Sequence, residues 1–158
     1  MSIYKDAAIG IGDVELTPVA AVEMRAALSQ ADLPDDQKMW FERAEHDARC
    51  VYFGIRRAHE LIGQIFLHDL EVARREAMVG YHVFQPSRRG RGYGSAALTA
   101  ICSYAFGALR LRRLVAITSL DNAASRRIAE KCGFRELGAA REGPHLIVYE
   151  RTSSITTS

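Results

Sequence analysis

The chain has 158 residues, of which 48% are hydrophobic and 25% charged, and its formal net charge is +2. This length predicts one domain that buries a core without metals or disulfides, and so small a net charge argues against a nucleic-acid-binding protein. No apolar run reaches membrane-spanning length, and Met1 to Asp6 lacks the basic start and apolar core of a signal peptide. We therefore expect a cytoplasmic protein that neither inserts into a membrane nor binds nucleic acid.

The three cysteines, Cys50, Cys102 and Cys132, form no C-x-x-C pair. Two of them fall on helix faces that the hydrophobic pattern predicts to be buried. Their spacing indicates neither a disulfide framework nor a zinc site, so we expect no metal and a reducing compartment.

The hydrophobic pattern predicts seven strands and four helices in a mixed order. The strands are expected at Val14 to Pro18, Cys50 to Arg57, Leu61 to Asp69, Glu76 to Phe84, Leu114 to Thr118, Phe134 to Ala139 and Leu146 to Arg151. The helices are expected at Val19 to Gln30, Pro34 to Asp47, Tyr93 to Leu109 and Asn122 to Cys132. Glu76 to Thr118 forms one strand-helix-strand unit, whose two strands should be parallel with a right-handed crossover.

The expected fold class is therefore α/β, in the mixed α+β sense, with a mixed and mostly antiparallel sheet. Short connections between the strands before Glu76 predict antiparallel hairpins there. One domain is expected over residues 1–151, followed by a polar tail from Thr152 to Ser158 that frays.

A basic, glycine-rich turn joins the strand expected to end at Phe84 to the helix expected to begin at Tyr93. Pro86 ends the strand because it lacks the N–H that a further ladder bond needs. The turn contains three glycines, Gly90, Gly92 and Gly94. They leave the N–H groups at the helix N-terminus open to an anion, and the helix dipole favours the same charge. The turn therefore predicts a phosphate or pyrophosphate site.

Two families use a turn of this kind. Gly92 to Ala97 matches the dinucleotide fingerprint G-x-G-x-x-G/A, and Asp121 lies far enough downstream to imitate its ribose-binding acid. A NAD(P)-dependent oxidoreductase is therefore one alternative, although a dinucleotide loop normally follows its strand directly. Read from Arg89 to Gly94, the turn resembles the R/Q-x-x-G-x-G/A pyrophosphate loop of the GCN5-related N-acetyltransferase (GNAT) superfamily.

A second signature lies downstream of the expected strand Leu114 to Thr118. The segment from Asn122 to Phe134, NAASRRIAEKCGF, resembles the second motif of the same superfamily. It is most similar to the branch of bacterial ribosomal-protein N-terminal acetyltransferases. Asp121 or Asn122 can cap the helix, and Gly133 can end it in the left-handed conformation. The resemblance implies the GNAT fold and acetyl-CoA as cosubstrate.

In that family two parallel strands splay apart, and the pantetheine arm of coenzyme A lies in the gap. The resemblance implies that the backbone of His82, Val83 and Phe84 pairs with pantetheine, and that a strand N–H near Val83 holds the thioester oxygen. Asn122 is implied to touch the cofactor's amide region, and it can also be a simple helix cap. The pyrophosphate is implied to lie among Arg89, Gly90, Arg91, Gly92, Tyr93, Gly94 and Ser95.

The implied reaction is direct attack of a primary amine on the acetyl carbonyl in a ternary complex. It needs a deprotonated amine, a stabilised oxyanion and a donor to the departing thiolate. Many members use a tyrosine donor where this chain has Ala129. The ribosomal-protein branch uses the serine of Asn-x-x-Ser, so Ser125 is the candidate donor here. Its alternative role is that of an ordinary first-turn helix residue.

The base is harder to assign, because Met78 stands where the family often carries a carboxylate. Side chains two apart on a strand share a face, so Glu76 and His82 lie on the side of Met78, and either could take the amine's proton through water. Alternatively, Glu76 is a solvated charge at the strand end and His82 a wall of the cofactor site.

The acceptor is expected to be a primary amine. Asp32 to Asp47 is locally acidic and would attract a cationic amine, such as a peptide N-terminus, an amino sugar or a polyamine. The alternative is a solvated amphipathic helix. The sequence is compatible with a homodimer. It assigns no catalytic or binding role to Trp40 or Tyr81. Because Met78 and Ala129 replace the family's usual groups, a non-enzymatic acyl-CoA-binding module is a further alternative.

Overall fold

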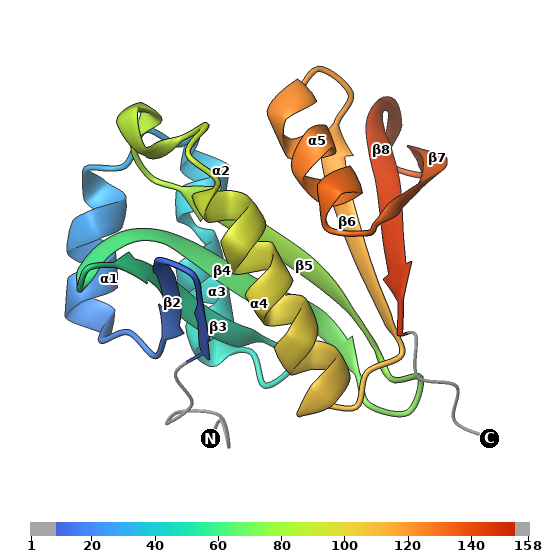
Figure 1. The fold of residues 1–158 in the computed structure, drawn as a ribbon, viewed down its shortest axis with the longest axis horizontal. Coiled ribbons are helices and arrows are strands. Elements are labelled where there is room, and N and C mark those ends of the chain that lie inside the picture. The colour runs from blue at the N-terminus through green and yellow to red at the C-terminus, as the bar shows by residue number, and fades with distance from the viewer. Residues whose placement is uncertain (1–8, 154–158) are drawn as a thin grey trace.

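The computed structural model describes residues 9–153, which form one eight-stranded sheet with helices on both faces (Figure 1). The strand order across the sheet is β1-β2-β3-β4-β5-β6-β8-β7. The strands are β1 (Ile9–Ile11), β2 (Val14–Thr17), β3 (Val51–Arg57), β4 (Glu60–Glu71), β5 (Glu76–Val83), β6 (Arg113–Ser119), β7 (Arg135–Ala140) and β8 (Gly143–Thr152). The helices are α1 (Ala21–Ser29), α2 (Asp35–Lys38), α3 (Trp40–His46), α4 (Tyr93–Gly107) and α5 (Ala123–Lys131), with a 3-10 turn, η1 (Pro86–Arg88).

The sheet is mixed, as the sequence predicts. Neighbouring strands in the described chain are antiparallel except β5 and β6, which are parallel and joined by α4. These two strands pair only from Glu76↔Arg113 to Met78↔Val115. Beyond Met78 they diverge, and Figure 1 shows the gap widening toward the end of β5 that leads into the glycine turn.

The two faces of the sheet carry different cores. On one face lies α4, whose Leu98, Ile101 and Ala105 are fully buried in the main hydrophobic cluster. On the other face, Met24 of α1 and Phe41 of α3 belong to a second cluster of buried side chains. Successive side chains of β5 therefore point to opposite faces of the sheet, and those of Ala77 and Val79 are buried in the main cluster.

The expected helix from Pro34 to Asp47 is instead two helices, separated at Met39. The break directly precedes Trp40, the first residue of α3, whose ring stacks on Phe66 of β4 with centroids 5.0 Å apart. Tertiary contact with the sheet thus overrides a continuous helical pattern. β1 was not predicted, because three residues carry too short an alternation. Of the expected polar tail, β8 includes Thr152, and 154–158 lie outside the described residues.

Gly63 of β4 is required by a close backbone contact. A Cβ placed there would lie 2.4 Å from the carbonyl oxygen of His82 on β5. We expect Gly63→Ala to lower the free energy of unfolding by about 2 kcal/mol, because β5 would have to move. Gly107→Ala in α4 is the matched control, since nothing lies within 4 Å of its Cβ position. Urea denaturation of both variants makes the comparison, and equal stabilities would contradict the assigned contact.

Candidate active site

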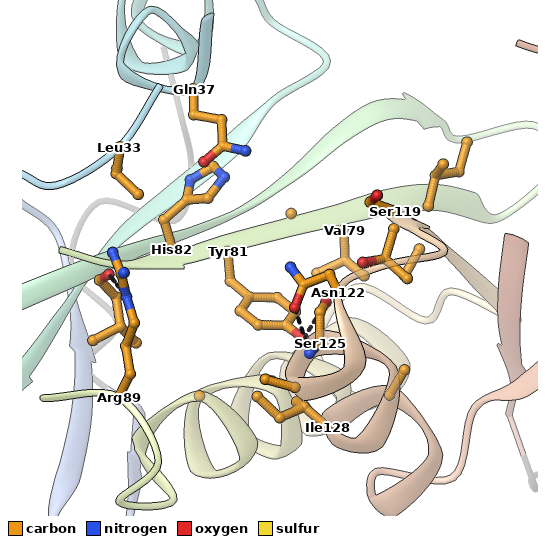
Figure 2. Close-up of a pocket in the computed structure, with 18 of the residues that line it drawn as sticks. Leu33, Gln37, Val79, Tyr81, His82, Arg89, Ser119, Asn122, Ser125 and Ile128 are labelled. Atoms are coloured by element: carbon orange, nitrogen blue, oxygen red, sulfur yellow. Dashed lines mark hydrogen bonds between the residues drawn. The ribbon is translucent and has the colours of Figure 1, made fainter. Parts of the chain in front are cut away.

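A cavity of about 1110 Å³ runs along the gap between β5 and β6 (Figure 2). At one end it is lined by the glycine turn and the first residues of α4, and α5 forms part of its wall. At the other end it reaches the aromatic side chains of Trp40 and Phe66. The cavity therefore connects the predicted anion site with the sheet face covered by α2 and α3.

The glycine turn has the conformation that its sequence predicts. Gly90 and Gly92 have φ angles of 74° and 85°, in the left-handed region that favours glycine. Gly92 is the N-cap of α4, and nothing lies within 4 Å of a Cβ at either position. The first N–H groups of α4, which have no helical acceptor, are thus open to a ligand in the cavity. An exposed helix N-terminus of this kind suits a phosphate, and the phosphate site stays a prediction.

The arginines of the turn mostly hold the turn itself. Arg89 donates from Nε to the carbonyl of Val83 at 3.1 Å and from its terminal nitrogens to the carbonyl and carboxylate of Asp32 at 2.7 and 3.2 Å. Arg91 donates to the carbonyl of Ser87 at 2.9 Å and does not line the cavity. The geometry gives no support to a place for Arg91 at the pyrophosphate, which stays a prediction. The other residues expected there do line the cavity: Arg89, Gly90, Gly92, Tyr93, Gly94 and Ser95.

The main chain of β5 offers fewer groups than expected. Phe84 donates its N–H to Ile62 and accepts through its carbonyl from the N–H of Asp32, both at 2.9 Å. Alternation along the strand turns the main chain of His82 toward β4 as well. The main-chain groups of Tyr81 and the N–H of Val83 are left to face the gap. Of the three residues expected to pair with pantetheine, the backbone geometry favours Val83 and adds Tyr81.

Hydroxyl groups meet on the α5 side of the gap. Asn122 caps α5, because its Oδ1 accepts from the N–H of Ser125 at 3.0 Å. The Oγ of Ser125 lies 3.4 Å from the Oη of Tyr81 (Figure 2). Ala129, where the resemblance implied a tyrosine donor in many members, also lines the cavity. Asn122, Ser125 and Tyr81 thus form one side of the cavity.

Tyr81 is a residue that the sequence reasoning missed. Burial raises the pKa of its phenol to about 12, although the hydrogen bond with Ser125 acts in the opposite direction. The phenol therefore stays protonated at neutral pH and can donate a proton or hydrogen bond. Alternation on β5 was the available signal, because it places Tyr81 on the face of α4, opposite His82.

His82 lines the cavity from the other face of β5 (Figure 2). Its Nδ1 lies 2.8 Å from the amide nitrogen of Gln64, which is fully buried on β4. Burial lowers the pKa of His82 to about 4, while the Asp36 carboxylate acts to raise this pKa and the Arg89 guanidinium to lower it. The imidazole is therefore neutral at physiological pH.

Glu76 lies far from both His82 and the cavity. It lies at the other end of β5, six positions from His82, which is roughly 20 Å along a strand. Its carboxylate lies 3.6 Å from the guanidinium of Arg113 and 3.8 Å from that of Arg112, and it does not line the cavity. Of the three catalytic candidates, the structure brings Ser125 and His82 to the cavity and leaves Glu76 outside.

The acceptor end is aromatic rather than acidic. The ring of Trp40 lies 5.0 Å from that of Phe66 and 4.6 Å from that of His68, and all three line the cavity. Within Asp32 to Asp47, the acidic side chains at the cavity are those of Asp32 and Asp36. Asp32 is paired with Arg89, and the glutamates of α3 pair with Arg25 away from the cavity. The expected acidic wall is thus largely absent from the described residues.

The lowered pKa of His82 predicts a pH-dependent stability. Between about pH 6.5 and pH 4 the unfolded chain binds a proton at this residue that the folded protein does not. Stability from His82 is therefore present above pH 6.5 and lost as the pH falls toward 4. We expect wild type to lose on the order of 2 kcal/mol more than His82→Asn across this window. Urea denaturation at a series of pH values measures it, and parallel curves would refute the burial of a neutral ring.

Comparison with known proteins identifies the family. Residues 9–135 match the family model described as an acetyltransferase (GNAT) domain. The Bacillus subtilis protein YoaA, named an uncharacterised N-acetyltransferase, is 36% identical over 104 residues, which cover 65% of this chain and 58% of YoaA. YdaF of the same bacterium, provisionally named a ribosomal N-acetyltransferase, is 32% identical over 111 residues, which cover 70% of this chain and 57% of YdaF. The chain thus spans a little over half the length of these relatives.

A solved structure gives the same fold. Mycobacterium smegmatis RimJ in complex with CoA-disulfide has a TM-score of 0.76 to this chain and 22% identity, and the match covers 94% of this chain and 88% of RimJ. The dinucleotide fingerprint at Gly92 to Ala97 requires the mostly parallel sheet of a Rossmann fold, whereas this sheet is mostly antiparallel. The oxidoreductase alternative therefore has no structural support.

Among the described residues, no helix is both long and apolar enough to cross a membrane. The chain belongs to the GNAT acetyltransferase family.

Proposed function

We propose that the protein is an acetyl-CoA-dependent N-acetyltransferase, which moves an acetyl group directly to a primary amine in a ternary complex. The acceptor is a peptide N-terminus or a small-molecule amine. The observation that carries this proposal is the continuous cavity from the glycine turn to the aromatic face. Such a cavity lets a phosphorylated cofactor and a second substrate approach one another from opposite ends.

The residues present fit coenzyme A. The open space at Gly90 and Gly92 and the start of α4 suit a pyrophosphate. The main-chain groups of Tyr81 and Val83 along the β5 edge suit the amides of pantetheine. Once bound, acetyl-CoA supplies a thioester whose carbonyl is open to an amine.

The chain's own contribution to acetyl transfer is then the placement of donors. The N–H of Val83 faces the gap, where it would stabilise negative charge on the carbonyl oxygen. Ser125 and Tyr81 place two hydroxyls 3.4 Å apart beside the same gap. If Tyr81 donates to Ser125, the serine hydroxyl is free to donate to the departing sulfur. This pair would take the place of the tyrosine that Ala129 replaces.

The second candidate is a non-enzymatic acyl-CoA-binding module. Met78 and Ala129 both line the cavity at positions where other members of the family carry a base and an acid. Such a module would bind acetyl-CoA without releasing free thiol in the presence of an amine. Thiol release against a panel of amines therefore distinguishes the two candidates.

The cofactor site predicts a charge-dependent affinity. Ser95, in the first turn of α4, lines the cavity beside the open N–H groups. Ser95→Glu should weaken acetyl-CoA binding by at least about tenfold, because a carboxylate would face the pyrophosphate. An acid in the first helical turn does not destabilise the fold, and Ser95→Gln controls for size. Calorimetric titration measures both affinities. Unchanged binding by Ser95→Glu would mean that the pyrophosphate lies elsewhere.

The hydroxyl pair predicts a loss of rate without a loss of cofactor. Ser125→Ala should lower kcat by about 100-fold, and Tyr81→Phe by a smaller factor, because each removes a donor from the path to the sulfur. The Kd of acetyl-CoA should stay within twofold in both variants. Thiol-release kinetics and titration on the same preparations test this. A Ser125→Ala variant with wild-type kcat would remove the serine from the mechanism.

A further inference from the structure

Three side chains from neighbouring strands form a hydrogen-bonded chain that ends at the cavity. Tyr52 of β3 donates its hydroxyl to Oε1 of Gln64 on β4. The amide nitrogen of Gln64 lies 2.8 Å from Nδ1 of His82, directly across from it on β5. Gln64 is 0% exposed, so this amide has no water to bind and must be satisfied by its neighbours.

The direction of this chain is fixed by a backbone carbonyl. The carbonyl oxygen of Gln37, which can only accept, lies 3.4 Å from the amide nitrogen of Gln64. The NH₂ group of Gln64 therefore faces Gln37 and His82, and its oxygen faces Tyr52. Burial raises the pKa of the Tyr52 phenol, so this hydroxyl keeps its proton and remains a donor.

The tautomer of His82 follows from these contacts. Nδ1 accepts from Gln64, so a neutral ring carries its proton on Nε2. The described residues supply no hydrogen-bond partner for Nε2, and His82 lines the cavity. The ring lies on the sheet face of Trp40 and Phe66, away from Ser125 and Tyr81. A hydrogen-bond donor is thereby presented to the acceptor end of the cavity.

We propose that Tyr52 and Gln64 are positioning residues that hold His82 as a neutral donor, and that its Nε2–H binds an oxygen of the amine substrate. This inference rests on the proposed acetyl transfer. A nitrogen that already carries a proton cannot take one from the amine, so the amine's proton leaves to water and His82 acts in substrate selection.

The donor distinguishes between classes of amine. A peptide N-terminus carries a carbonyl oxygen close to its amino group, which can accept from Nε2–H. A polyamine offers only N–H donors and positive charge beside this site, and its interaction with the ring is unfavourable. The geometry therefore favours a peptide α-amine over a polyamine.

The tautomer is measured directly on the protein without substrate. Long-range ¹H–¹⁵N spectra of the labelled imidazole at neutral pH should show a protonated Nε2 and a bare Nδ1 for His82. In Gln64→Glu the new carboxylate can only accept, so the proton should move to Nδ1. Tyr52→Phe, which keeps the ring, is the second variant and should lower the population of the Nε2–H form. An Nδ1–H or doubly protonated ring in wild type would overturn the inference.

Substrate selection is measured with two probes, an amidated alanine tripeptide and spermidine. His82→Phe should lower kcat/KM for the tripeptide about tenfold, the effect of one hydrogen bond, and for spermidine less than twofold. His82→Asn, which keeps an N–H donor, should recover part of the tripeptide activity. Equal losses with both amines would overturn the donor role.

Measurements on the wild-type protein distinguish the proposed acetyl transfer from the proposed preference for a peptide α-amine. Turnover of spermidine but not of the tripeptide would overturn the substrate class and leave the acetyltransferase intact. Turnover of neither amine, with acetyl-CoA bound, would count against the proposed function as well as the substrate class, while the imidazole spectra still decide how His82 is held.

Discussion

The site depends on the early separation of β5 from β6. The two strands pair at three positions, whereas β6 pairs with β8 at seven. Because β6 follows β8, the rest of β5 keeps a partner only on its β4 edge. Main-chain groups on the other edge then lie inside the molecule without a strand to bind them, and groups of this kind need another partner. A cofactor that carries amides could form hydrogen bonds with these main-chain groups of β5.

Charges hold the closed end of the gap together. Arg113, the first residue of β6, binds Glu150 of β8 at 2.8 Å and lies 3.6 Å from Glu76 of β5. Arg135 and Arg113 keep the pKa of the Glu150 carboxyl below its usual value. Glu76, one of the two candidate bases, is thus part of the contact that keeps the strands paired where the gap begins. Its distance from His82 follows from the same geometry, since the cavity opens at the other end of β5.

The sequence predicted what is encoded locally. The glycine turn, α4 and the parallel pair follow from residues close together in the chain, and each is confirmed. The contacts made across the sheet could not be predicted in this way. Tyr52 and His82 reach Gln64 from 12 and 18 positions away, and Arg89 reaches Asp32 from 57. The charge of Arg89 suggested a phosphate ligand, but its partner lies on a loop that no local pattern connects to the turn.

Gln64 is an informative residue because its buried amide pairs with side chains on both neighbouring strands. It and Glu150 are the buried polar side chains of the described core. An apolar side chain in place of Gln64 would leave the Tyr52 hydroxyl and Nδ1 of His82 without this partner, and each buried group left unpaired costs about 1–3 kcal/mol. The same amide determines how the ring of His82 is held, because its NH₂ group faces Nδ1. Gln64 therefore links the stability of the sheet to the choice of which ring nitrogen carries the proton at the cavity wall.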